Sequence, residues 1–271
     1  MADGGGGPEH PPALEVVGLG VSYGGIAAVS DVSFSVAPGE VLGLIGPNGA
    51  GKTTTIDALT GFVPHRGVVR VHGVDVSGRP PHERVRAGLV RTWQAVELFE
   101  DLTVAEHLEV AEPSAGVRDV MADILRPRRR AARGTPVGGA DPELLAGLGL
   151  DRVAGSLVTD LPQGTQKLVG VARALASRPR VLLLDEPAAG LDTTESRRFG
   201  EHLRSIAERD RAVVLVDHDV ELVMASCDRV VVLDFGSVIA SGPPAEIRDD
   251  LRVQEAYLGR SIGVEDRGAP G

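Results

Sequence analysis

The pattern of hydrophobic and polar positions divides most of the chain into alternating strand-like and helix-like segments. Four apolar runs are typical of strands buried on both faces of a sheet: VLGLIG (41–46), VLLLD (181–185), AVVLV (212–216) and RVVVLD (229–234). Segments with the apolar spacing of helices include TTTIDALTGF (53–62) and KLVGVARALA (167–176). This alternation predicts an α/β fold built on a mostly parallel sheet.

Two regions outside this alternation have a different texture. LEVVGLGVSY and VSDVSFSV, between residues 14 and 36, read as short strands, and GVVRVHGVDV (67–76) alternates like a strand pair. They predict an N-terminal antiparallel β subdomain. From Leu102 to about Asp160 the strand signal is weak, and two helical segments flank a basic, loop-like stretch at 126–139. We interpret this region as an inserted helical subdomain.

The amino-acid composition limits the classes of partner that we expect such a fold to bind. The net charge is −10, from 28 basic and 38 acidic residues, and aromatic residues make up 3%. Nucleic-acid-binding proteins are normally basic and often stack bases on aromatic side chains, so we predict no nucleic-acid partner. Cys227 is the only cysteine, which fits a reducing compartment and a buried apolar role. No run approaches the roughly 18 apolar residues of a membrane span, so a membrane link is expected through a partner.

The segment GPNGAGKT (46–53) has the spacing of a phosphate-binding loop between a strand and a helix. Its glycines let backbone N–H groups turn towards phosphate oxygens, and the helix adds its positive end. A glycine-rich turn without function would not explain why Lys52 and Thr53 follow the last glycine. We expect the nucleotide contacts to come from Gly46, Pro47, Asn48, Gly49, Ala50, Gly51, Lys52, Thr53 and Thr54.

Two acids follow the apolar run VLLL. Asp185 at the end of this strand can hold Mg²⁺ through water and so complement the Thr53 hydroxyl. Glu186 can orient or deprotonate an attacking water. The alternative is that the two acids form an ordinary strand end or helix cap. The phosphate-binding loop upstream favours the functional interpretation.

Gln94 and His218 are candidates to complete a hydrolytic site. Gln94 follows the strand-like LVRTW and could reach Mg²⁺ or the attacking water; alone it reads as a surface glutamine. His218 follows the run AVVLV. Ligands in open α/β sheets bind beyond the carboxyl ends of the strands, so His218 is placed to contact a γ-phosphate.

Taken in the order in which they occur along the chain, these motifs resemble those of the ATP-binding subunits of ABC transporters. The resemblance covers residues 14–259. Stretches such as YGGIAAVSDVSF, DEPAAGLD and AEIRDDLRVQEAYLG resemble the branch that energises branched-chain amino-acid import. The resemblance implies that Tyr23 stacks on adenine, with a core aromatic as the alternative. It also implies that Gly164 and Asp192 act in trans on ATP held by a second cassette, and that a helix starts near Thr165.

The resemblance implies a P-loop ATPase core at 14–94 and 162–259 and an insertion at 95–161. Residues 1–13 and 260–271 are expected to be a disordered tail and a flexible tail. The implied activity is hydrolysis of ATP with Mg²⁺. It would energise an importer for branched-chain amino acids; urea, amides or another small solute, or a non-transport ATPase, are the alternatives.

The implied partners are a second cassette, identical or different, integral membrane permease subunits and, indirectly, a solute-binding protein. The chain would lie peripherally at the cytoplasmic face of the membrane. AVELFEDLTV (95–104) is where such cassettes receive a coupling helix, and Leu98 and Phe99 look exposed enough to contact it; internal packing is the alternative. The basic stretch reads as a solvated loop, with lipid headgroups as another contact.

The segment LPQGTQ (161–166) departs from the family signature Leu-Ser-Gly-Gly-Gln. Leu161 and Gly164 match, while Pro162 stands in place of the serine, whose hydroxyl would have bonded a γ-phosphate oxygen. The backbone N–H of Gly164 and the following helix start remain. We interpret the segment as a working but altered signature; a regulatory subunit without hydrolysis is the alternative.

Overall fold

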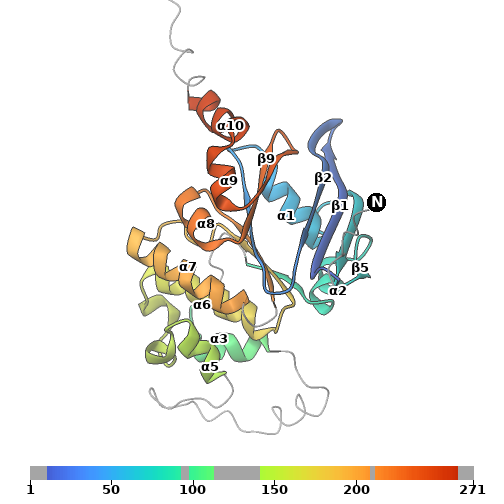
Figure 1. The fold of residues 1–271 in the computed structure, drawn as a ribbon. Helices are drawn as coiled ribbons and strands as arrows, with labels where there is room; N and C mark the ends of the chain where they lie inside the picture. The colour runs from blue at the N-terminus through green and yellow to red at the C-terminus, as the bar shows by residue number, and fades with distance from the viewer. Residues whose placement is uncertain (1–10, 93–97, 113–140, 208–210, 262–271) are drawn as a thin grey trace, which may run out of the picture.

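A computed structural model describes residues 11–92, 98–112, 141–207 and 211–261 of the 271-residue chain (Figure 1). Gln94 and the basic stretch at 126–139 lie outside the described residues, and so do most of the expected N- and C-terminal tails. Within the described residues, no helix has the length and apolar character that a membrane span would need.

The larger sheet has six strands in the order β10-β9-β3-β8-β7-β6. Their bounds are β3 Val41–Ile45, β6 Leu89–Arg91, β7 Val181–Asp185, β8 Ala212–Val216, β9 Arg229–Asp234 and β10 Ser237–Gly242. All neighbours pair in parallel except β9 and β10. Every residue of β3, β7 and β8 is buried, as expected for a parallel sheet covered on both faces. The predicted α/β architecture is confirmed.

The smaller sheet is antiparallel, with four strands in the order β2-β1-β4-β5. It comprises β1 Leu14–Tyr23, β2 Ile26–Val36, β4 Arg66–Val71 and β5 Val74–Asp75. In β2 the buried side chains alternate with exposed ones from Val32 to Val36, because one face packs on the core and the other meets solvent. This sheet is the predicted N-terminal antiparallel unit.

Helices cover both faces of the six-stranded sheet (Figure 1). One face carries α1 (Lys52–Thr60), which lies between the two sheets, and α2 (Pro81–Arg86) follows β5. The remaining helices are α3 Val104–Ala111, α5 Pro142–Gly147, α6 Gln163–Ala176, α7 Thr193–Ala207, α8 Val220–Ser226, α9 Pro244–Asp249 and α10 Leu251–Ser261, with 3-10 turns at Asp151–Val153 and Val158–Asp160. The regular structure in the described part of 95–161 is thus helical, apart from one bridge between Thr103 and Leu157.

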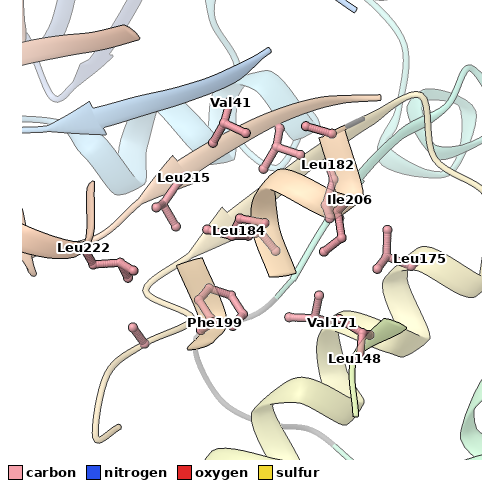
Figure 2. Packing of buried hydrophobic residues seen from close by; sticks show 14 of the residues in the cluster. Val41, Leu148, Val171, Leu175, Leu182, Leu184, Phe199, Ile206, Leu215 and Leu222 are labelled. Carbon is pink, nitrogen blue, oxygen red and sulfur yellow. The ribbon is translucent and has the colours of Figure 1, made fainter. Parts of the chain in front are cut away.

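Alternation along β7 divides the apolar core into two clusters. Leu182 and Leu184 pack with the helices α6, α7 and α8 on one face, as Figure 2 shows for Leu184 and Phe199. Val181 and Leu183 pack on the other face with α1 and the antiparallel sheet. Successive side chains of a strand point to opposite faces, so one short strand stabilises both layers. The sheet edge where the strands end is thereby held rigidly between two cores.

The structure refines one local expectation and corrects another. The helix expected near Thr165 begins at Gln163, because Pro162, with φ −55° and ψ 150°, is its N-cap. Gln163, Gly164 and Thr165 therefore form the first turn of α6. Leu98 is half-buried against the α6 side of the core, and only Phe99 of this pair is exposed.

Candidate functional site

The loop between β3 and α1 holds its glycines where no larger residue fits. A Cβ atom on Gly46, whose φ is +152°, would lie 2.1 Å from the carbonyl oxygen of Leu233 in β9. A Cβ atom on Gly51, with φ +100°, would lie 2.7 Å from the carbonyl oxygen of Ala28 in β2. The loop is thus pressed against the backbones of both sheets, and glycine is required by close approach as well as by φ.

The Lys52 side chain is folded into this loop. It is 8% exposed, and its Nζ donates to the carbonyl oxygens of Gly46 at 2.6 Å and Pro47 at 3.2 Å. Thr53, the next residue, is exposed on the first turn of α1. No side chain caps the start of this helix. The backbone N–H groups and the positive helix end at this point therefore suit a phosphate.

Asp185 ends β7 as a buried acid, with 3% exposure. Burial raises the pKa of its carboxyl above the ordinary value, and the neighbouring Arg91 guanidinium counteracts this rise. Glu186 follows with a φ of +47°, a conformation that costs a non-glycine residue free energy. Its N–H donates to the carbonyl oxygen of Val216 at the end of β8, 2.7 Å away. The surrounding strand ends thus hold Glu186 in a strained position.

Sequence reasoning missed Arg91 and Asp57. The guanidinium of Arg91 makes an ion pair with Asp57 of α1 at 2.5 Å and with Asp185 at 3.0 Å. Arg91 was visible only as a basic residue in the short segment LVRTW before Gln94. Asp57 lies one helical turn after Thr53 and therefore on the same side of α1. Nothing in the sequence joins positions 57, 91 and 185.

His218 lies two residues beyond β8, which pairs with β7 so that Val216 is opposite Asp185. The imidazole is exposed, and its Nδ1 is 3.5 Å from Oδ1 of the buried Asp217. The Asp217 carboxylate also accepts the backbone N–H groups of Ala188 and Asp219. His218 is therefore carried on a segment tied to the chain that follows Glu186. Asp217 was not predicted.

Gly164 and Asp192 lie at the starts of α6 and α7, which pack against each other. A Cβ atom on Gly164 would lie 2.8 Å from Leu191 Cδ2 and 3.0 Å from Glu195 Oε1, so α6 packs closely against the start of α7. Asp192 Oδ1 accepts the N–H groups of Thr194 and Glu195, both at 2.8 Å, and so caps α7. Asp192 thus has a structural role beside the predicted one.

Lys167 links α6 to the segment after β7, since its Nζ donates to the carbonyl oxygen of Ala189. Burial lowers the pKa of its ammonium group, and the carboxylates of Asp217 and Glu186 oppose this shift. The helix that follows the signature segment is therefore connected electrostatically to the acids at the strand ends. Lys167 was also missed, because it reads as an ordinary helix cation.

Tyr23 ends β1 at the tip of the first hairpin, opposite Ile26. It is 51% exposed, so the alternative of a core aromatic is wrong. Tyr257 of α10 was not singled out from the sequence. Burial raises the pKa of its phenol, while a hydrogen bond from the Gly46 N–H lowers it. The C-terminal helix therefore reaches the phosphate-binding loop.

Comparisons with known proteins agree with this geometry. The family described as "ABC transporter" matches residues 29–189, more than half of the chain. The family described as "Branched-chain amino acid ATP-binding cassette transporter" matches residues 237–262, which span β10, α9 and α10.

Two relatives are similar over nearly their whole length. The high-affinity branched-chain amino acid transport ATP-binding protein BraF of Pseudomonas aeruginosa is 39% identical over 256 residues, 92% of this chain and 99% of BraF. LivG of Escherichia coli K12, which carries the same description, is 36% identical over 253 residues, 92% of this chain and 99% of LivG.

A solved structure, the ADP conformation of MJ1267, an ATP-binding cassette of an ABC transporter, aligns with a TM-score of 0.78 at 26% identity. The alignment covers 92% of this chain and 99% of that chain. The expected fold, the family branch and the ATP-hydrolase class are confirmed together, and the chain belongs to the ABC transporter family, as one of its ATP-binding cassettes.

Proposed function

We propose that this chain is the ATP-binding and ATP-hydrolysing subunit that energises an importer of branched-chain amino acids. The observation that carries the proposal is that Lys52, Asp185 and Glu186 are all placed at the carboxyl edge of one sheet, at the ends of the parallel strands β3 and β7. Ligands bind at this edge in open α/β sheets. The names of BraF and LivG and the family match at 237–262 support the amino-acid branch.

Nucleotide binding uses the phosphate-binding loop and the first hairpin. Lys52 leaves its two carbonyl partners and donates to the β- and γ-phosphates, while the N–H groups of the loop surround the phosphate oxygens. The exposed Tyr23 stacks on the adenine ring, because an aromatic face at a hairpin tip can cover a planar base.

The donors around Thr53 and Asp185 fit Mg²⁺, which prefers hydroxyl, carboxylate and water oxygens. Their fit rests on Arg91, which ties Asp185 to the α1 residue one turn beyond Thr53. When bound, Mg²⁺ neutralises charge on the phosphates. Gln94 was predicted as a further ligand; it lies outside the described residues and stays a prediction.

Hydrolysis relies on Glu186 and His218. Glu186, fixed by its strained backbone and by the bond to Val216, orients and deprotonates the attacking water. His218, exposed beyond the neighbouring strand, donates to a γ-phosphate oxygen. Asp217 keeps both segments in one arrangement, because its carboxylate joins the residues after β8 to Ala188.

A second cassette completes the site. The start of α6, with exposed Pro162 and Gln163, presents the N–H groups of its first turn to ATP held by the partner. Asp192 lies between Leu191 and Glu195 in the chain, the two residues that pack against Gly164. An identical or a different cassette meets this description equally well.

The membrane partner would contact a groove of about 350 Å³ between β6, α2, α3 and α6. The exposed side chains of Val85, Phe99 and Val110 line it, and so does Glu186. An apolar groove suits an amphipathic helix of a permease. Such a partner would hold the chain peripherally at the cytoplasmic face of the membrane.

The substitution Glu186→Gln tests this function. We expect it to keep ATP binding but to lower turnover about a thousandfold and to trap a dimer, since an amide cannot accept the water's proton. ATPase assays and size-exclusion chromatography with ATP measure both effects. Equal ATPase rates in the variant and the parent would exclude Glu186 as the base.

The solute requires a separate experiment, because permease and binding-protein subunits select it. We expect vesicles containing the assembled complex to accumulate leucine, isoleucine or valine with ATP. Uptake of urea, an amide or another solute instead would keep the ATPase role and correct the substrate.

A further inference from the structure

Arg91 is unusual because its charged side chain is almost completely buried. Its side chain is 7% exposed, yet its guanidinium contacts two carboxylates from different elements, Asp57 of α1 and Asp185 of β7. The ring of Phe62 lies on the same guanidinium, with its centroid 5.9 Å from Cζ. Buried charges are retained at low free-energy cost only when they are paired, and both acids depend on the same cation.

The two ion pairs fix the direction of the Asp185 carboxylate. Arg91 Nη2 engages Oδ2 of Asp185, while Nη1 is held by Asp57, so the planar guanidinium is anchored at both ends. This contact does not use the second oxygen of Asp185, Oδ1. The Arg91 guanidinium thus holds the Asp185 carboxylate in one orientation.

The same contacts tie together the two candidate Mg²⁺ ligands. Thr53 is one turn before Asp57 on α1, and Asp185 ends β7, so one guanidinium sets the helix against the strand. Two carboxylates and one guanidinium leave one net negative charge on the group. The group therefore still attracts a cation, although Arg91 is positive.

We propose that Arg91 is a positioning residue for Mg²⁺ in this cassette, acting through the orientation of Asp185 and through the spacing between Asp185 and Thr53. The inference rests on the proposed role of these two residues in holding the ion. It predicts that Arg91 strengthens the coupling between Mg²⁺ and nucleotide, and that it leaves the binding of nucleotide without metal nearly unchanged.

The experiment measures the affinity of the full chain for a non-hydrolysable ATP analogue by calorimetry, once with Mg²⁺ and once with EDTA. The ratio of the two affinities reports the coupling. We expect Arg91→Met to reduce this ratio about tenfold and to change the affinity in EDTA less than twofold. Arg91→Lys, which keeps the charge but cannot bridge both acids, is expected to recover only part of the ratio.

A matched control is Arg70→Met, which removes the partner of Glu15 in a half-exposed pair at 2.7 Å on the antiparallel sheet. It is expected to change neither affinity. A double-mutant cycle adds the mechanism: in an Asp185→Asn background, Arg91→Met should have no further effect on the ratio. An effect of equal size in that background would overturn the proposal.

Two other results would also contradict the inference. Equal losses of affinity in Mg²⁺ and in EDTA would mean that Arg91 only supports the fold. If Arg91→Met does not fold, Arg91→Lys together with Asp57→Asn provides the same comparison of the two affinities. An affinity of the parent chain that is independent of Mg²⁺ would remove the role of Asp185 and Thr53 as well, and so overturn the proposed site rather than Arg91 alone.

Discussion

The helices α1 and α6 both begin without a side-chain cap, but the atoms packed around their first residues differ. Neither has a side-chain cap at its first turn. In contrast, an Asp or Thr side chain accepts first-turn N–H groups in α3, α5, α7 and α8. The short helices α2 and α9 lack such a cap too, but each begins with a proline, which has no N–H to satisfy.

The atoms around the start of each helix determine which substitutions can be accommodated there. At α1, the glycines of the loop lie against backbone atoms of both sheets, which cannot move aside. At α6, Gly164 meets only the far ends of the Leu191 and Glu195 side chains, and Pro162 is exposed. The start of α1 is therefore fixed by backbone atoms, and the start of α6, which we propose faces a second cassette, is fixed by adjustable side chains. We therefore expect substitutions to be accommodated better at the second helix start than at the first.

The strongest test of this comparison is a pair of alanine substitutions. Gly46→Ala should destabilise the chain by about 4 kcal/mol, since a Cβ atom would overlap a carbonyl oxygen and strain φ. Gly164→Ala should cost about 1 kcal/mol, because two side-chain ends can rotate away. Urea unfolding measures both. Similar costs at the two positions would contradict the distinction between rigid and adjustable surroundings.

Lys52→Ala is expected to have a smaller effect, confined to the first helix start. Loss of the ammonium should weaken nucleotide binding about a hundredfold, which is about 2.8 kcal/mol. Calorimetry on the isolated chain measures this. Lys167→Ala is the control, since this cation lies after the second helix start and should leave the affinity of a single cassette unchanged. Unchanged binding in Lys52→Ala would remove the lysine from the nucleotide site.

Pro162→Ser should have the smallest effect. A serine there would add one hydroxyl to a helix start that already presents its N–H groups, so we expect the ATPase rate of the assembled complex to change less than tenfold. The affinity of the isolated chain for nucleotide should stay the same. An increase above tenfold would show that the native segment is a degenerate signature rather than a working one.

The sequence predicts best those parts of the site that local physics determines. Gly46, Gly51 and Lys52 are specified by spacing within one loop, and Asp185 by its place after an apolar strand. Arg91, Asp57 and Asp217 could not be predicted, because their roles come from contacts between segments that are far apart in the chain.

The start of α6 shows another limit of reading the sequence alone. Gln163-Gly164-Thr165 has the composition of a turn, but Pro162 supplies an extended N-cap, and Gly164 is needed for close packing against Leu191 rather than for a left-handed φ. Composition alone does not separate these two uses of glycine. The exposed fraction of Leu98 was misjudged for a similar reason, since its packing depends on α6.

The two carbonyl oxygens that receive the Lys52 ammonium have a consequence for the nucleotide itself. In the proposed site, phosphate competes with Gly46 and Pro47 for the same protons, so part of the binding free energy goes into opening an internal contact. The dissociation constant of the cassette is therefore a balance between two occupants of one site. Changes that weaken the internal occupant would tighten binding without touching ATP.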